Sequence, residues 1–533
     1  MGFVGRSIYL AATEAESGKS AVALGLLDQL TRRAGRIGIF RPVVRALTDD
    51  SLVELLLAHG RSGQDAGSAT GVTYADVHED AERALATIVE KFHAVADAHD
   101  VVLVIGSDFS DVAAPTEFSV NARIAANLGS SLAVVLPAAS QRVEDTVRAA
   151  ALAVLAARDS HATVGAVIAN RVPEADLARF VTALTEELAP VPAFAVPEVP
   201  LLSAPTVADL SAAVEGTLVH GDPALLDREV SGLVVAAMTL PHVLDRLVEG
   251  SVVVVPGDRE EIVVGTLLAH RSTTFPSLAG VVLNGGFTLS SQVERLIDGL
   301  DVRLPILGCR QGTMRTAMTL HATRGSITPG ATRKIAAAVA AVGESVDVMV
   351  LLDGADLGPE HVVTPLMFEH DLIEGARRAD AHIVLPEGTE PRILHAAAIS
   401  TQRRIARITL LGNPDEVRAA AVLTGVDLAG IDIVDPATSP WRPEFARELA
   451  RLRAHKGVTH DGALDILTDP SYFGTMMVHL DRADAMVSGS VTTTAATVRP
   501  ALEIVRTSPD VSVVSSVFFM ALADRVLVYG DCA

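Results

Sequence analysis

Short apolar runs, each bounded by Gly, Pro or Asp, recur along this chain and alternate with amphipathic segments of helical periodicity. Runs such as VVLVIG (101–106) and SVVVVP (251–256) are rich in β-branched residues, which is typical of strands buried on both faces of a parallel sheet. They fall well short of the roughly 18 apolar residues that a membrane-spanning helix needs. The alternation predicts an α/β fold in which helices cover both faces of parallel sheets.

The chain has 533 residues, which is too long for one hydrophobic core, and its patterns divide into three segments. We expect a first domain over 1–195, a second over 206–355 and a third over 366–533. The stretch 189–205 is rich in proline and predicts an extended linker. The run 354–365, with its Gly and Pro residues, predicts the second boundary.

Apolar runs in the second segment predict another parallel sheet, and the third segment repeats the pattern from a helix that begins near Met367. The strands that we expect in the second segment are 233–238, 251–257, 278–286, 304–309 and 346–352.

Charge and composition exclude several classes of protein. The net charge of −22 argues against a nucleic-acid partner, because phosphate backbones are bound by basic surfaces. Only two cysteines occur, Cys309 and Cys532, which leaves no disulfide framework and no cysteine-based zinc site. The first residues lack the basic flank and long apolar stretch of a signal peptide. We therefore expect a cytoplasmic protein with no membrane association.

The segment ATEAESGKS (12–20) follows a predicted strand and precedes a predicted helix, which is the setting of a phosphate-binding loop. Gly18 allows close approach of the backbone to an anion, Lys19 supplies positive charge, and Ser20 is placed to reach a magnesium ion. The pattern predicts a P-loop-like fold for the first domain.

The same loop departs from an active nucleotide cradle. Ala12 stands where such loops open with glycine, and Glu14 and Glu16 place negative charge where phosphates would bind. We therefore expect a degenerate loop kept for its geometry, and rank an ATP-dependent carboxylate- or amide-activating enzyme as the weakest alternative. Asp108 ends a predicted strand and either supports a metal ion or terminates the strand in a turn.

In the second segment, the turn PGDREE (256–261) leaves a strand and enters a helix. Exposed backbone N–H groups at Gly257, Asp258 and Arg259 could meet an anion there. A plain structural turn is the alternative, and it is the favoured one.

Hydroxyl side chains and an arginine gather near the end of the third segment. Ser490, Thr492 and Thr493 lie in a glycine-containing loop, and Arg499 precedes a predicted helix over 500–506. A proline in the first helical turn, free N–H groups and the macrodipole favour an anion at that helix start. Arg499 can grip a phosphate or carboxylate with two hydrogen bonds.

Arg453 belongs to the basic cluster RLRAHKGVT (451–459) in an otherwise acidic chain. It either contacts an anionic ligand or forms the charged end of a helix. His479 has no neighbour at metal-ligand spacing and is expected to be a packed histidine. Cys532 follows an apolar strand and is expected to be a buried thiol without a nearby base. We expect no metal site.

Seven segments of the third domain occur in an order found in one enzyme family: IVLPEG, DPATSP, RLRAHKGVT, SYFGTMMVH, DAMVSG, TVRPALEIV and SSVFFM. In this order they resemble the phosphate acetyltransferases. The first domain resembles the dethiobiotin-synthetase-like P-loop fold. The second resembles the DRTGG regulatory domain, although Glu260 and Glu261 replace the Thr-Gly of that motif. Over essentially all of its length, the chain is similar to the long, three-domain bacterial form.

The resemblance implies reversible transfer of an acetyl group between coenzyme A and inorganic phosphate, with acetyl phosphate as the other partner. It implies direct attack of the coenzyme A thiolate, with no metal or cofactor, in a homo-oligomer. By the same resemblance, Arg453 and Arg499 contact phosphate groups of coenzyme A.

In the family, the catalytic base and the oxyanion-binding residues lie downstream of the segment that ends at Ala533. No residue of this sequence is therefore expected to take those parts. We also expect an exposed strand edge and lower stability beyond residue 365. The alternative is a non-catalytic regulatory or assembly protein that has kept the first two domains.

Overall fold

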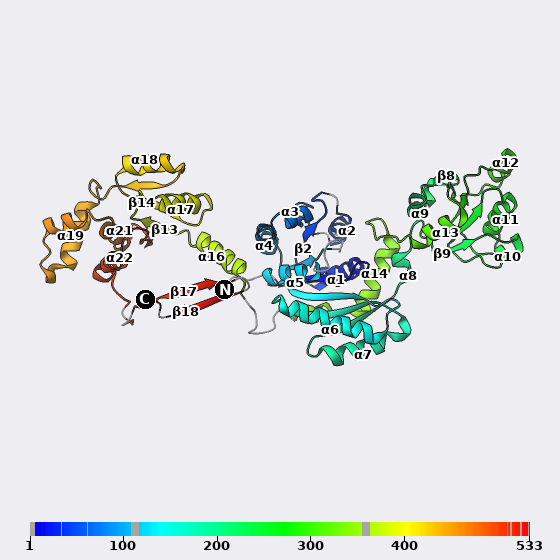
Figure 1. The fold of residues 1–533 in the computed structure, drawn as a ribbon, viewed down its shortest axis with the longest axis horizontal. Coiled ribbons are helices and arrows are strands. Elements are labelled where there is room, and N and C mark those ends of the chain that lie inside the picture. Colours follow the sequence, from blue (N-terminus) through cyan, green and yellow to red (C-terminus); the bar gives the residue numbers. More distant parts are fainter. Residues whose placement is uncertain are drawn as a thin grey trace. The chain divides into compact units, whose positions relative to one another are not determined.

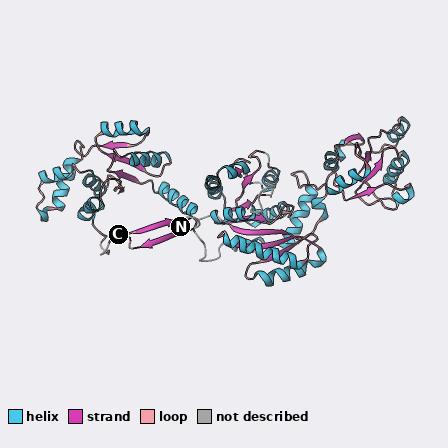
Figure 2. Ribbon diagram, in the orientation of Figure 1, coloured by secondary structure: helices cyan, strands magenta, loops and turns pink. Residues whose placement is uncertain are grey.

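The computed structural model describes residues 6–33, 35–48, 50–60, 62–107, 117–353, 363–508, 510–511, 514–522, 525–530 and 532 (Figure 1). The chain divides into two compact units, Met1–His361 and Val362–Ala533. Strands and helices alternate through both units, which confirms the predicted α/β class (Figure 2).

The first unit begins with a seven-stranded sheet in the order β3-β2-β4-β1-β5-β6-β7, and every neighbouring pair is parallel. The central strands β1 and β4 are buried on both faces, β4 over its whole length and β1 from Ser7 onward, as helix-covered parallel sheets require. The strands are β1 (Arg6–Ala12), β2 (Ile37–Val44), β3 (Thr70–Thr73), β4 (Val101–Ile105), β5 (Ser131–Pro137), β6 (Val164–Val172) and β7 (Ala193–Pro197).

Helices on both faces bury this sheet (Figure 1). Helix α1 carries an apolar face that packs into the core cluster on one side of this sheet, because its Ala, Val and Leu residues recur at helical spacing. The helices are α1 (Lys19–Arg33), α2 (Ser51–Gly60), α3 (Tyr74–Glu79), α4 (Ala81–Ala98), α5 (Glu117–Asn127), α6 (Val143–Asp159), α7 (Leu177–Leu188) and α8 (Pro200–Ser203).

The proline-rich stretch 189–205 is not the extended linker that the sequence predicted. Its residues form β7 and α8, and β7 pairs with β6. Because β7 is the outermost strand of the sheet, a proline at its end removes no ladder hydrogen bond that the sheet needs. Composition alone could not distinguish an edge strand from a linker.

A smaller five-stranded sheet follows, in the order β8-β12-β11-β10-β9. Four of its strands were predicted, whereas the short antiparallel strand β8 was not. The elements are α9 (Val207–Ala213), β8 (Thr217–His220), β9 (Gly232–Val235), α10 (Leu240–Leu244), β10 (Ser251–Pro256), α11 (Glu260–Arg271), β11 (Gly280–Asn284), α12 (Ser291–Gly299), β12 (Ile306–Gly308) and α13 (Thr313–Ala322).

After this sheet the chain returns to the first domain. Helices α14 (Thr332–Ser345) and α15 (Val348–Asp353) add Ala338, Val342 and Leu351 to the core cluster that contains α1. The run 346–352 was predicted as a strand of the second sheet, and that prediction is wrong. A short apolar run is equally compatible with a buried strand and a buried helix.

The second unit has a four-stranded parallel sheet in the order β15-β14-β13-β16, with a core cluster on each face. Several of its helices carry proline in the first turn, where the missing N–H has no partner to lose. The elements are α16 (Pro365–Ala379), β13 (His382–Leu385), α17 (Pro391–Gln402), β14 (Arg407–Leu411), α18 (Pro414–Thr424), β15 (Asp432–Val434), α19 (Arg442–Leu452), α20 (His460–Ile466), α21 (Pro470–His479), β16 (Ala485–Met486) and α22 (Thr494–Pro500).

A two-stranded antiparallel ribbon, β17 (Val517–Ala521) and β18 (Val526–Gly530), ends the described part of this unit. Within the described residues it pairs with no other strand, so strand edges are exposed, as the sequence predicted. Phe518 is 58 % exposed and Val528 is 62 % exposed, although both are apolar. The ring of Phe519 contacts Phe368 of α16, with ring centroids 5.1 Å apart.

The close packing of α14 on α1 gives a first testable prediction. A Cβ atom at Gly25 would lie 2.4 Å from Cβ of Val342, so Gly25→Ala overpacks this contact and should cost about 1–3 kcal/mol. Gly343→Ala on α14 is the matched control, because nothing lies within 4 Å of its Cβ position, and it should stabilise the helix by roughly 0.5–1 kcal/mol. Denaturant unfolding of the full chain measures both. Equal effects of the two substitutions would contradict this packing.

The exposed ribbon gives a second prediction. Val528→Glu places a charge on an apolar strand edge and should slow the self-association of the protein, measured by static light scattering against concentration. Leu423→Glu, at an apolar helix residue that is 88 % exposed, is the control and should change little. If both variants self-associate to the same extent as the parent chain, the ribbon is not the surface through which the protein self-associates.

Candidate functional site

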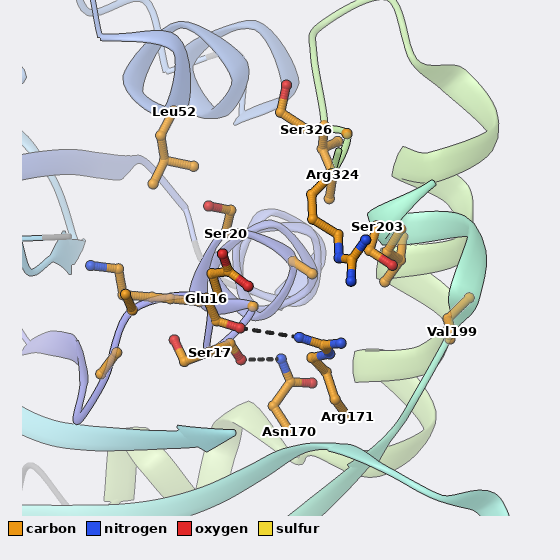
Figure 3. A pocket seen from close by; sticks show the side chains of 18 of the residues that line it. Glu16, Ser17, Ser20, Leu52, Asn170, Arg171, Val199, Ser203, Arg324 and Ser326 are labelled. Carbon is orange, nitrogen blue, oxygen red and sulfur yellow. Dashed lines mark hydrogen bonds between the residues drawn. The ribbon is translucent and has the colours of Figure 1, made fainter. Parts of the chain in front are cut away.

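The N-terminal loop keeps the geometry of an anion-binding loop. It joins β1 to α1, and Gly18 has a φ of +75°, a left-handed conformation that favours glycine. A Cβ atom at Gly18 would lie 2.3 Å from Nδ2 of Asn170. That Nδ2 donates a 2.8 Å hydrogen bond to the carbonyl oxygen of Ser17, which fixes the loop on the end of β6 (Figure 3).

The ammonium group of Lys19 is engaged by main-chain carbonyl groups. Its side chain is buried, and Nζ donates to the carbonyl oxygens of Gly106 and Ser107 at the end of β4. The positive charge of Lys19 is therefore stabilised by two carbonyl groups of the protein itself. Asp108, the predicted metal-supporting residue, lies outside the described residues.

A cavity of about 370 Å³ opens beside this loop (Figure 3). The sequence predicted Gly18, Lys19 and Ser20 as a degenerate loop, and all three line the cavity. Its other walls come from the ends of β6 and β7 and from residues 324–327, which follow α13. No sequence signal pointed to that last segment.

The turn at the start of α11 is held by internal contacts. The carboxylate of Glu260 accepts hydrogen bonds from the backbone N–H and hydroxyl groups of Ser290, and Arg259 forms a 2.6 Å ion pair with Glu261. The two glutamates that depart from the DRTGG motif thus stabilise the turn, Glu260 by hydrogen bonds to Ser290 and Glu261 by its ion pair with Arg259. These contacts fit the favoured reading of a structural turn.

In the second unit, the hydroxyl-rich loop wraps around a buried carboxylate. The backbone N–H groups of Gly489, Ser490, Val491 and Thr492 donate to Glu387 over 3.3, 2.8, 2.8 and 2.7 Å. Burial raises the pKa of Glu387, but hydrogen bonds from Val491, Thr492 and Ser490 outweigh it and hold that pKa at about 2. The backbone N–H groups of this loop therefore already hold an anion of the protein, and only its side chains are left for a ligand.

The helix next to this loop begins earlier than predicted. Helix α22 starts at Thr494, and the side chain of Thr493 caps it by accepting from the N–H of Ala496. Pro500 lies inside the helical segment, where a π-helical turn over Ala501–Val505 follows. The prediction of a helix start at Pro500 is wrong. Threonine is a strong N-cap residue, and Thr493 takes that position, so the helix begins before the proline is reached. Arg499 is consequently not at a helix N-terminus.

The side chains of Arg453, Tyr472 and Glu503 are joined by direct contacts, and the charge of Arg499 influences the same phenol. Arg453 forms a 3.1 Å ion pair with Glu503, and the hydroxyl of Tyr472 donates a 2.9 Å hydrogen bond to the same carboxylate. Burial, together with Glu503, raises the pKa of Tyr472 to about 12, while the charges of Arg499 and Arg453 act in the opposite direction. Both predicted arginines thus lie close enough to one phenol to influence its ionisation.

The remaining predicted residues are distributed around this cluster. Ser490 is half-buried, with a hydroxyl that has no hydrogen-bond partner in the described part of the chain. The side chain of Thr492 bonds to Glu387, and that of Thr493 is engaged in capping. The expected packed histidine, His479, lies 3.2 Å from Glu448, and Cys532 is partly exposed rather than buried.

Sequence reasoning missed Glu387, Tyr472 and Glu503. Glu387 follows a buried strand in the turn Pro-Glu-Gly, where an acidic side chain turned inward needs donors to satisfy it. Glu503 is an isolated acid in the otherwise apolar ALEIV segment. Such acids in apolar surroundings were the signals available in the sequence.

Comparison with known proteins identifies the family. The chain is 38 % identical over 551 residues to the phosphate acetyltransferase of Nitratidesulfovibrio vulgaris, a match that covers 99 % of this chain and 77 % of that protein. It is 37 % identical over 541 residues to the phosphate acetyltransferase of Synechocystis sp., with the same coverage. The chain belongs to the phosphate acetyltransferase family.

Three family models match consecutive parts of this phosphate acetyltransferase family member. They are an AAA domain over 6–206, a DRTGG domain over 209–323 and a phosphate acetyl/butaryl transferase domain over 367–533. Among solved structures, a Staphylococcus aureus EutD phosphotransacetylase is 36 % identical, covering 31 % of this chain and 51 % of that one, with a TM-score of 0.29. The family resemblance inferred from the sequence motifs is confirmed.

The described residues contain neither a metal-binding cluster nor a membrane-spanning helix. No group of three or more His, Cys, Asp and Glu side chains is placed to hold a metal ion. Likewise, no helix in that part of the protein has both the length and the apolar character needed to cross a bilayer.

The carboxylate within the loop gives a third prediction. Because the pKa of Glu387 is about 2 in the folded protein and 4.5 ordinarily, the unfolded chain takes up a proton first as the pH falls. The stabilisation from this carboxylate is full above pH 4.5 and is lost progressively toward pH 2. Glu387→Gln should therefore be less stable than the parent at pH 7, with the difference shrinking in that window.

Unfolding curves between pH 7 and pH 2.5 measure the difference, and amide exchange at 489–492 should become faster in Glu387→Gln. Glu369→Gln, at an exposed helix position, is the control and should show a flat difference. If the difference in free energy of unfolding between Glu387→Gln and the parent does not change with pH, the stabilising role given to the ionised Glu387 is wrong.

Proposed function

We propose that this chain transfers an acetyl group between coenzyme A and inorganic phosphate, and that the surface around Tyr472 binds the anionic groups of its substrates. The match to phosphate acetyltransferases over 99 % of the chain carries the proposal. The approach of Arg453 and Arg499 to one tyrosine supports the location.

The reaction exchanges two acyl acceptors. In one direction the thiolate of coenzyme A attacks the carbonyl carbon of acetyl phosphate, a C–S bond forms, and the C–O bond to phosphate breaks. Inorganic phosphate leaves, and the proton lost by the thiol must be accepted by a base. Acetyl-CoA and phosphate react by the reverse steps.

The two arginines are not equivalent as anion ligands. Arg499 is exposed and has no ion-pair partner within the described part of this unit, so it can form a bidentate contact with a phosphate at little cost. Arg453 is already paired with Glu503, and its side chain is 18 % exposed. We infer that Arg499 makes the primary contact with coenzyme A, and that Arg453 adds positive charge behind it.

The loop contributes side chains rather than backbone N–H groups. Glu387 occupies those of residues 489–492, so Ser490 is the loop residue with a free hydroxyl for a phosphate oxygen. Thr492 and Thr493 hold the loop in shape through their contacts with Glu387 and α22. Ser490 is accordingly the proposed hydroxyl ligand.

The wider setting is also part of the proposal. The two cysteines are free thiols, in keeping with a reducing cytoplasm. The exposed apolar ribbon supports a homo-oligomer. We infer that no cofactor takes part, coenzyme A and acetyl-CoA being substrates.

A direct assay tests the proposed activity. Purified protein mixed with acetyl phosphate and coenzyme A should form acetyl-CoA, followed by the absorbance of the thioester bond, and should release an equal amount of phosphate. Absence of thioester formation from a protein that retains its far-ultraviolet dichroism and cooperative unfolding would overturn the proposal for this chain.

Substitution of Arg499 gives the fourth prediction. Arg499→Gln removes a charge-assisted hydrogen bond worth about 1.5–3 kcal/mol and should raise the KM for coenzyme A roughly tenfold or more, with little change in kcat. Arg447→Gln, at an exposed arginine of α19, is the control. An unchanged KM for coenzyme A in Arg499→Gln would move the binding site elsewhere.

A further inference from the structure

The cavity beside the N-terminal loop has no part in acetyl transfer as proposed above, yet it has the features of a ligand site. Its volume of about 370 Å³ lies within the roughly 300–1,000 Å³ of small-molecule sites. It is lined by residues from five separate stretches of the first unit. Its walls include both apolar side chains and donors.

Hydrogen-bond donors in the loop lack partners. The backbone N–H groups of Ser17, Gly18 and Ser20 have no acceptor among the described residues, and they precede or begin a 15-residue helix. Ser17 lines the cavity and is 3 % exposed, and its hydroxyl likewise has no partner in the described ranges. Ser17 is buried, whereas Gly18 and Ser20 are half-buried beside the cavity, so an anion in the cavity can accept hydrogen bonds from these groups.

Two arginines supply positive charge from opposite walls. Arg171, at the end of β6, donates to the carbonyl oxygen of Glu16 and pairs with Glu198 at 3.1 Å. Arg324, which follows α13, bonds only to backbone carbonyls of its own turn within the described residues. Both reach toward the same side of the loop (Figure 3). An anion at the loop would therefore find an arginine without a carboxylate partner.

The loop is poorly suited to a nucleoside triphosphate with magnesium. Lys19 is bound to Gly106 and Ser107 and does not face a γ-phosphate. Glu14 and Glu16 line the same cavity and would repel a highly charged ligand. One compact anionic group on the loop N–H groups is favoured, because it gains their hydrogen bonds with less repulsion.

The cavity also has an apolar region. Leu52, Val199, Leu202 and Ile327 line it, together with the polar Ser51, Ser203 and Ser326. A ligand that satisfies both regions has one anionic group and a flat or compact apolar body.

We propose that this cavity binds a phosphomonoester with an apolar body, without a divalent metal ion. The phosphate lies on the N–H groups of Ser17, Gly18 and Ser20 with the hydroxyl of Ser17, and Arg324 closes over it. The apolar body lies against Leu52 and Ile327. Residues 324–327 connect the domain of the five-stranded sheet to α14, which packs on the seven-stranded domain. The ligand therefore contacts both the N-terminal loop and this connecting segment.

Calorimetric titration of the full chain with AMP tests this proposal, in the absence and presence of magnesium. AMP should bind without magnesium and more tightly than ribose 5-phosphate, which has the same phosphate but no base for the apolar wall. Inorganic phosphate should bind more weakly than either. Arg324→Glu and Ser17→Ala should each weaken AMP binding, the former at least tenfold.

Two control variants locate the binding. Arg295→Glu reverses the charge of an exposed arginine on α12, which is outside the cavity, and should leave AMP binding unchanged. Arg499→Gln should also leave it unchanged, which separates this site from the proposed coenzyme A site and keeps the outcome independent of acetyl transfer.

Three results would overturn the proposal. They are no AMP binding at millimolar concentration, AMP binding that survives both Arg324→Glu and Ser17→Ala, and tighter binding of magnesium-ATP than of AMP. Loss of AMP binding in Arg499→Gln would likewise place AMP in the second unit and not in this cavity.

Discussion

A single buried carboxylate organises the candidate site of the second unit. Four consecutive N–H groups of the loop 489–492 converge on Glu387, an arrangement that otherwise binds phosphate or another free anion. With this internal anion in place, the loop has its shape before any substrate arrives. The loop in turn sets the start of α22, and α22 carries Arg499 toward Tyr472.

The fold was largely predictable because buried parallel strands have a strong local signature. The runs that form β4, β5 and β10 are apolar, rich in valine and bounded by turn residues. Errors arose where local patterns are ambiguous. The segment 346–352 is apolar in either conformation, and β7 ends in a proline within a proline-rich stretch that is equally compatible with a linker. Neither outcome could be decided without knowing which neighbour each segment meets.

The candidate site was less predictable than the fold. The sequence pointed to Arg453 and Arg499, and the structure places both near one tyrosine. It could not show that Glu387, about a hundred residues earlier, would accept hydrogen bonds from the backbone N–H groups of the hydroxyl-rich loop. Nor could it show that Lys19 would face inward to two carbonyl groups. Contacts between distant segments decide which donors remain free, and periodicity carries no information about them.

The return of α14 and α15 to the first domain has a consequence during synthesis. The ribosome releases the chain in order, so the seven-stranded sheet and α1 emerge before the residues that cover this face of α1. Residues 204–331 must be translated in between, which at roughly 5–20 residues per second takes on the order of ten seconds. For that interval the apolar face of α1 is open, and the nascent protein depends on chaperones or on rapid folding of the smaller sheet to avoid misassociation.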